Sequence, residues 1–169
     1  MRARSGRIDD AAAIAEIYNT GIAERTATFE TRPRSTEEVA AWFGDRYPVV
    51  VVEESGSVVA FAAASAYHPG RDCYEGIAEF SVYTAPAARR RGAAHLAMEA
   101  LIDAAVAGGF WKLLSRVLVE NEPSRRLLTN VGFREVGIYR RHARLDAEWR
   151  DVVIVERLLG DAAQPESRG

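Results

Sequence analysis

The chain reads A-E-F-S-V-Y-T-A-P-A-A-R-R-R-G-A-A from Ala78 to Ala94, and these residues carry the clearest pattern of secondary structure in the sequence. Its first six residues are typical of a strand, and the five that follow, Thr84 to Ala88, include a proline and read as a turn. Beyond the turn, apolar residues recur at intervals of three and four, which predicts a helix from near Arg91 to Gly108-Gly109. The apolar face of that helix consists of Ala94, Ala97, Met98, Leu101, Ile102 and Ala105.

The start of this helix has the features of a phosphate site. The first backbone N–H groups of a helix have no partner within it, and the small residues Gly92-Ala93-Ala94 allow a phosphate to approach them. Arg89-Arg90-Arg91 adds positive charge just upstream. The P-loop is excluded because the one lysine of the chain is Lys112, and the dinucleotide fingerprint is excluded because it needs three glycines. The stretch therefore predicts a pyrophosphate cradle, with an acidic residue, Glu79, on the preceding strand.

The pattern Arg89-x-x-Gly92-x-Ala94 resembles the R/Q-x-x-G-x-G/A signature of the GNAT acetyltransferases, in which backbone amides hold the pyrophosphate of acetyl-CoA. Further blocks, which span residues 2 to 159, resemble the phosphinothricin N-acetyltransferase branch of this superfamily. Within the branch, segments 26–31, 76–83 and 149–157 look closest to bacterial arsinothricin-resistance N-acetyltransferases. The matching blocks are Tyr18-Asn19, Thr28-Phe29-Glu30, Arg71-Asp72-Cys73-Tyr74, Glu79 to Tyr83, Asn121-Glu122-Pro123-Ser124, Val131-Gly132-Phe133 and Glu148 to Val152.

Length and charge are those of a compact enzyme. With 169 residues and 48% hydrophobic content, the chain has the size of a single domain, which we expect over residues 1–160. Polar residues 161–169 are expected to form a disordered tail. The net charge of −2 offers no general attraction to nucleic acid or to an anionic membrane. No apolar run approaches the roughly 20 residues of a membrane span, and a single cysteine suits a reducing compartment, so we expect a cytoplasmic protein.

We expect an α/β (α+β) chain with the GNAT fold, in which a central mixed, mostly antiparallel sheet of about six to seven strands has helices on both faces. Asp9 or Asp10 is predicted to cap the first helix, and Ser35 or Thr36 a second helix that runs through Trp42 and Phe43. A later helix contains Pro123 in its first turn and ends at Gly132. The predicted strands cover residues 3–7, 49–52, 58–61, 77–83, 113–119, 133–139 and 152–158.

Glu79 is the candidate catalytic residue. Acetyl transfer from a thioester to an amine needs a group that removes a proton from the amine. Glu79 alternates with Ile77, Ser81 and Tyr83 on one strand face, so its side chain can face the acyl group while Phe80 packs in the core. By resemblance Glu79 is the general base, acting through a water, with direct transfer in a ternary complex. The alternative is an ordinary strand glutamate that faces solvent.

The resemblance also implies which residues bind acetyl-CoA. Backbone groups of the strand would bind the pantetheine arm as an added strand, and an amide there would polarise the thioester carbonyl. Asn121 would contact the CoA arm, although an asparagine two residues before Pro123 is equally typical of a helix cap or turn. The predicted set is Val82, Tyr83, Thr84, Arg89, Arg90, Arg91, Gly92, Ala93, Ala94, His95, Asn121 and Ser124.

One position departs from the family pattern. Many GNAT enzymes carry a tyrosine seven residues after the motif asparagine as general acid, and phosphinothricin acetyltransferases often carry a histidine there, but this residue is Leu128. A thiol with a pKa of about 8.5 is a tolerable leaving group at neutral pH. Either the CoA thiolate therefore leaves unassisted, or Tyr139, His142 or Tyr83 supplies the proton.

For the acceptor, the resemblance implies a small glutamate-mimic amino acid such as phosphinothricin, arsinothricin or methionine sulfoximine, whose acetylation confers resistance. Arg71 and Tyr74 stand where the family grips its substrate, and a guanidinium can bind a carboxylate or phosphinate bidentately. Alternatively, Arg71 is a solvated loop arginine. Phe29 would form a wall of the substrate site beside Glu79. The resemblance further implies a homodimer.

Two other classes of function stay open. An acyl-CoA-binding module with weak catalysis is compatible with Leu128, although it would not need an acid at Glu79. A protein N-terminal acetyltransferase shares the cosubstrate but needs an open groove. No metal is expected, because His68, His95 and His142 are far apart in the sequence and lack paired ligands at zinc-like spacing.

Overall fold

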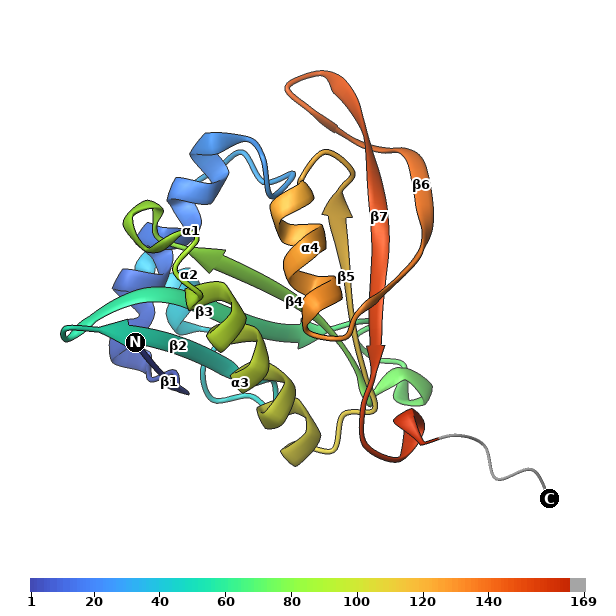
Figure 1. The fold of residues 1–169 in the computed structure, drawn as a ribbon, viewed down its shortest axis with the longest axis horizontal. Helices are drawn as coiled ribbons and strands as arrows, with labels where there is room; N and C mark the ends of the chain where they lie inside the picture. The colour runs from blue at the N-terminus through green and yellow to red at the C-terminus, as the bar shows by residue number, and fades with distance from the viewer. Residues whose placement is uncertain (165–169) are drawn as a thin grey trace.

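The computed structural model describes residues 1–164, which form a seven-stranded sheet flanked by helices (Figure 1). The strand order is β1-β2-β3-β4-β5-β7-β6, and every neighbouring pair is antiparallel except β4 and β5. This confirms the mixed, mostly antiparallel sheet that the sequence predicts. The strands are β1 (Arg2–Ser5), β2 (Val49–Glu54), β3 (Ser57–Ala66), β4 (Ile77–Thr84), β5 (Lys112–Leu118), β6 (Arg134–Leu145) and β7 (Glu148–Leu158).

Helices cover both faces of the sheet, with α3 and α4 on one face and α1 and α2 on the other (Figure 1). The helices are α1 (Ala11–Glu24), α2 (Thr36–Ala40), α3 (Ala93–Ala107) and α4 (Glu122–Asn130). Short 3-10 turns lie at Ile8–Asp10, Asp72–Tyr74, Pro86–Ala88 and Gly160–Ala163. The last turn overlaps residues 161–163 of the segment that was predicted to be a disordered tail, and residues 165–169 of that prediction lie outside the described residues.

Two apolar cores lie against the opposite faces of the sheet. Val50 and Val52 of β2 pack in the core beneath α3, whereas Val49 and Val51 pack beneath α1. All four valines are buried because both faces are covered, which explains the uninterrupted apolar run in the sequence. The predicted apolar face of α3 is confirmed for its buried members Ala97, Met98, Leu101, Ile102 and Ala105.

The last two strands are longer than predicted. β6 runs to Leu145 and β7 begins at Glu148, so residues 140–151, which the predicted strands leave out, form a hairpin. Its turn residues Asp146 and Ala147 both have positive φ angles, 49° and 66°, as in a type I′ turn. The prediction stopped short because β6 is an edge strand with exposed, charged residues, and such strands lack an alternating apolar pattern.

The two predicted helix caps have different outcomes. Ser35 forms a capping box at α2: its hydroxyl accepts from the Glu38 backbone N–H at 3.2 Å, and the Glu38 carboxylate accepts from the Ser35 N–H at 2.8 Å. Helix α2 ends at Ala40, short of the predicted helix, which ran through Trp42 and Phe43. Asp10 is the N-cap residue of α1, as one of the two predicted alternatives had it, but its side chain forms no capping hydrogen bond with α1. The carboxylate instead accepts from the Arg7 backbone N–H at 2.7 Å and from the Arg4 guanidinium.

Candidate active site

The sheet opens between β4 and β5. These parallel strands pair only where Ile77–Glu79 meets Lys112–Leu114, and beyond that point they diverge (Figure 1). The Ser115 hydroxyl donates a hydrogen bond to the Phe80 carbonyl at 2.9 Å at the start of the opening. From there to Thr84, the edge of β4 that faces β5 has no paired strand among residues 1–164. An extended ligand can therefore add along this edge as a strand would.

A cleft of about 1430 Å³ occupies this opening. Pockets for one drug-sized ligand are usually about 300–1,000 Å³, so the cleft is larger than such a pocket. Its walls come from β4, β5, the start of α3, α4, the loop between α1 and α2, and β6. Residues of the predicted site that line it are Phe29, Glu79, Val82, Tyr83, Thr84, Arg89, Arg90, Gly92, Ala93, Ala94, His95, Asn121 and Ser124.

The start of α3 forms one end of the cleft. Gly92 has a φ angle of +88°, a backbone conformation that favours glycine, and Ala93 and Ala94 expose the first turn of the helix to the cleft. The first N–H groups of α3 have no partner within the helix, so they can bind an anion. Arg89 and Arg90 line this end. Arg91 does not line the cleft and instead forms an ion pair with Glu54 of β2 at 2.6 Å, so the structure brings two of the three predicted arginines to the cradle.

Glu79 lies where the two strands separate. Its carboxylate accepts a hydrogen bond at 2.6 Å from the guanidinium of Arg116, a residue of β5 that also lines the cleft. The side chains are 26% and 40% exposed, so the ion pair is accessible to solvent and to a substrate. Arg116 was not among the site residues predicted from the sequence. It lies in the predicted strand 113–119, but the pairing of this strand with β4 is seen only in the structure.

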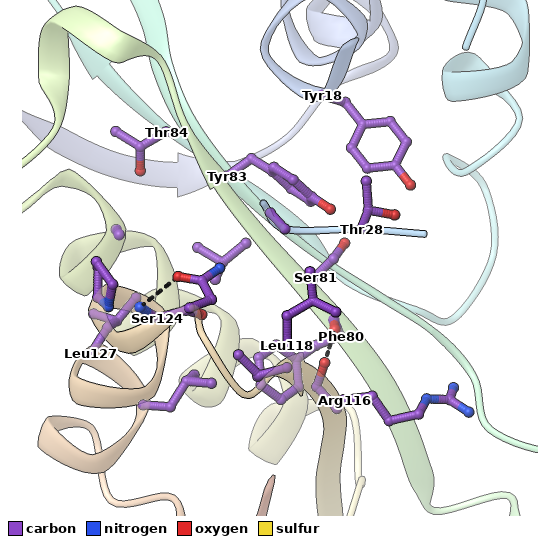
Figure 2. A pocket seen from close by; sticks show the side chains of 18 of the residues that line it. Tyr18, Thr28, Phe80, Ser81, Tyr83, Thr84, Arg116, Leu118, Ser124 and Leu127 are labelled. Carbon is purple, nitrogen blue, oxygen red and sulfur yellow. Dashed lines mark hydrogen bonds between the residues drawn. The ribbon is translucent and has the colours of Figure 1, made fainter. Parts of the chain in front are cut away.

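Hydroxyl groups gather above Ser81 on the α1 side of the cleft. Tyr18, Thr28 and Tyr83 point toward one another there (Figure 2). The Tyr83 ring lies 4.9 Å from the Tyr18 ring and 5.5 Å from Phe61, measured between ring centroids. Burial raises the pKa of both phenols, so both are protonated at neutral pH and can donate hydrogen bonds. Tyr18 and Thr28 belong to the blocks that resemble the family, but no site role was predicted for either residue from the sequence.

Asn121 has the helix-cap role that the sequence left open. Its side-chain oxygen accepts from the Ser124 backbone N–H at 3.2 Å, and its amide donates to the Thr26 carbonyl at 3.2 Å (Figure 2 shows the Ser124 bond). Asn121 therefore links α4 to the loop that carries Phe29. It also lines the cleft, so a contact with the CoA arm stays a prediction. Leu128, on the same helix, lines the cleft and is 1% exposed.

A bulge in β6 brings His142 to the cleft. Tyr139 pairs with Val152 and Ala143 with Arg150, so three residues of β6 lie opposite the single residue Asp151. The Asp151 carboxylate accepts from the Arg141 backbone N–H at 2.7 Å and stabilises the bulge. Of the three proton donors that the sequence suggests in place of Leu128, His142 and Tyr83 line the cleft and Tyr139 does not.

Arg71 and Tyr74, the predicted substrate clamp, do not line the cleft. They lie in the segment before β4, with the Arg71 guanidinium 5.2 Å from the centre of the Tyr74 ring. Tyr67 and His68 pack against Tyr74. Within the described chain, the cation next to Glu79 is thus Arg116 rather than Arg71, and a substrate contact of Arg71 stays a prediction.

Residues 1–164 contain no cluster of three or more metal-ligating side chains. None of the helices described for the chain is long and apolar enough to cross a membrane.

A sheet that opens beside a helix N-terminus can accommodate a ligand with an extended arm and an anionic group, and Glu79 places a carboxylate at the opening. The model of the acetyltransferase (GNAT) family matches residues 14–133, and the chain belongs to that family. The N-acetyltransferase class predicted from the sequence is therefore confirmed.

Its relatives include amino-acid acetyltransferases. The chain is 31% identical to the phosphinothricin N-acetyltransferase of Streptomyces coelicolor, covering 94% of this chain and 96% of the relative. It is 29% identical to the L-methionine sulfoximine/L-methionine sulfone acetyltransferase of Salmonella typhimurium, covering 94% of each. A phosphinothricin acetyltransferase from Sinorhizobium meliloti, solved in complex with acetyl-CoA, superposes with a TM-score of 0.86 at 29% identity and covers 98% of this chain and 93% of that one. These findings agree with the predicted branch of the family and with acetyl-CoA as cosubstrate.

Proposed function

We propose that residues 1–160 act as one catalytic domain that transfers the acetyl group of acetyl-CoA to the α-amino group of a small glutamate-mimic amino acid. Candidate acceptors are phosphinothricin, methionine sulfoximine and arsinothricin, and their acetylation would confer resistance. The observation that carries the proposal is the shared cleft, in which Glu79 lies at the strand opening and the Gly92 cradle at one end. The relatives act on acceptors of this kind.

In this proposal, different residues of the cleft bind the cosubstrate and catalyse the transfer. The N–H groups at the start of α3, with Arg89 and Arg90, bind the pyrophosphate, and the free edge of β4 binds the pantetheine arm. A β4 amide polarises the thioester carbonyl and stabilises the negative charge that develops on its oxygen. Glu79 removes a proton from the acceptor ammonium through a water, which leaves a neutral amine to attack.

The thiolate that departs can be protonated from two sides of the cleft. Leu128 cannot donate a proton, but His142 and Tyr83 both line the cleft. The raised pKa of the buried Tyr83 phenol keeps its proton in place at neutral pH. We propose that the thiolate either leaves unassisted or takes its proton from one of these two groups, and that no covalent acetyl-enzyme forms.

The test is a thiol-release assay with acetyl-CoA against phosphinothricin, methionine sulfoximine, arsinothricin and peptides with free N-termini, comparing kcat/KM. We expect one amino acid to exceed the peptides by orders of magnitude. Preference for a peptide would instead identify a protein N-terminal acetyltransferase. Binding of acetyl-CoA without turnover of any acceptor would identify an acyl-CoA-binding module.

Glu79→Gln tests the base. We expect kcat to fall by about 10²- to 10⁴-fold near neutral pH, the usual contribution of general base catalysis. The loss should shrink at high pH, where more of the amine is already neutral. Equal activity of wild type and variant across the pH range would exclude the base role.

We further propose that the enzyme works as a cytoplasmic homodimer. Support for self-association comes from the outer hairpin of the sheet, where Val136, Ile138, Tyr139 and Trp149 are all exposed. A free cysteine, Cys73, suits a reducing compartment. Sedimentation velocity should give the mass of two chains, and a monomer at micromolar concentration would contradict the proposal.

A further inference from the structure

Arg116 has unused hydrogen-bonding capacity beside the candidate base. A guanidinium carries five N–H donors, and among residues 1–164 one donor of Arg116 is engaged, in the 2.6 Å bond to Glu79. The side chain extends from β5 across β4 (Figure 2), lines the cleft and is 40% exposed. Its remaining donors are therefore available to an anion that enters the cleft.

Of the other arginines that line the cleft, Arg89 and Arg32 form ion pairs with glutamates outside it. Arg89 and Arg90 belong to the turn before α3, and Arg89 forms an ion pair with Glu24 at 2.7 Å. Arg32 donates to both carboxylate oxygens of Glu38, at 2.6 and 3.3 Å. Arg116 is thus the lining arginine that lies in contact with Glu79.

Arg116 also lies on the acceptor side of the sheet. Strand residues alternate between faces, so Arg116 shares a face with Leu114 and Leu118, and these two leucines pack with Phe29 of the α1–α2 loop. Leu114 pairs with Glu79 in the parallel ladder, which places both members of the ion pair on this face. A substrate bounded by Phe29 would therefore meet the guanidinium and the carboxylate together.

We propose that Arg116 binds the α-carboxylate of the amino-acid acceptor and so determines the specificity for free amino acids. The ammonium and carboxylate of an α-amino acid share one carbon, so a carboxylate held by Arg116 places the amine beside Glu79. The substrate then either shares the guanidinium with Glu79 or replaces it as its partner. This inference rests on the proposed function, because it concerns the acceptor of that same reaction.

The test compares methionine sulfoximine with its α-carboxamide, in which the carboxylate charge is removed and the amine is kept. For Arg116→Met we expect kcat/KM with the carboxylate to fall about 10- to 150-fold, the range for a hydrogen bond to a charged group, mainly through KM. With the carboxamide as acceptor, kcat/KM of Arg116→Met should fall less than about 3-fold. Arg116→Lys keeps a positive charge but lacks the planar guanidinium, so its kcat/KM with the carboxylate acceptor should lie between the values for wild type and Arg116→Met. Arg134→Met, on the outer strand, serves as the control.

Three results would overturn the inference, and each differs from failure of the proposed function. Equal losses with both acceptors, in kcat and with a displaced pH profile, would mean that Arg116 merely positions Glu79. If Arg71→Met no longer prefers methionine sulfoximine over its carboxamide while Arg116→Met still does, the residue that binds the α-carboxylate is Arg71. A thermal melt well below that of wild type in both Arg116 variants would mean a purely structural role. If wild type acetylates neither compound nor any other amino acid, the proposed function itself has failed.

Discussion

Gly92 offers a direct test of the phosphate cradle at α3. Its φ angle is +88°, and a Cβ added there meets no atom within 4 Å. Replacement by alanine therefore costs backbone strain without a steric clash. A non-glycine residue in this left-handed region costs about 1–2 kcal/mol.

Two effects follow from the Gly92→Ala substitution. For a domain of this size, about 1–2 kcal/mol lowers Tm by roughly 2–8 °C. The strain can be relieved by rotating the peptide groups on either side of residue 92, which carry the amides of Gly92 and Ala93. Because these amides face the pyrophosphate in our proposal, we expect KM for acetyl-CoA to rise about 10-fold, equivalent to about 1.4 kcal/mol.

Gly56→Ala is the matched control. Gly56 lies in the β2–β3 turn with a φ angle of +83° and open space around it, and it does not line the cleft. It should lose the same stability in thermal melts while KM for acetyl-CoA stays at the wild-type value. A Gly92→Ala enzyme with the lower Tm but an unchanged KM would refute the cradle at α3, and so would an equal rise in KM for Gly56→Ala.

Two further substitutions test stability. Hydrogen bonds from Arg4 hold the pKa of the Asp10 carboxyl below its usual value. The ionised carboxylate therefore stabilises the folded state fully at pH values above the unfolded pKa, which is about 4. This stabilisation is lost as the pH falls through the lower pKa of the folded state. Asp10→Asn should cost about 1.5–3 kcal/mol at pH 7 and clearly less at pH 3 in urea unfolding; an equal cost at both pH values would contradict this. Gly21→Ala places a Cβ 2.7 Å from the Tyr83 ring and should cost about 1–3 kcal/mol, which an unchanged urea midpoint would refute.

Local patterns predicted most of the elements. The three-and-four spacing of α3 and the valine run of β2 correspond to elements in the structure, because both patterns report which faces of a segment are buried. The outer half of the β6–β7 hairpin was missed, since an exposed edge strand carries no such pattern. Asp10 is the N-cap residue of α1 as predicted, but its carboxylate binds Arg4 of β1 and the Arg7 N–H rather than the first turn of α1, which the local sequence does not show.

Some features of the candidate site could likewise be predicted from local sequence, whereas others depend on the tertiary structure. The Gly92 cradle needs only a helix start and small residues, which neighbouring letters of the sequence reveal. The sequence does not show which of the three arginines faces the start of α3, because this depends on the conformation of the turn. In that turn Arg90 and Gly92 both have positive φ angles, and Arg91 forms an ion pair with Glu54 on β2.

Sequence patterns alone predicted the order of the strands and helices, the buried face of α3, the apolar run of β2 and the glycine at the start of α3, because each depends on residues a few positions apart. The tertiary structure alone decided that β4 and β5 part after Glu79 and that Arg116 lies against its carboxylate. These two residues are 37 positions apart in the chain. Their contact exists because a parallel pair must be joined by a crossover helix, and the register of that pairing is set by packing across the whole sheet.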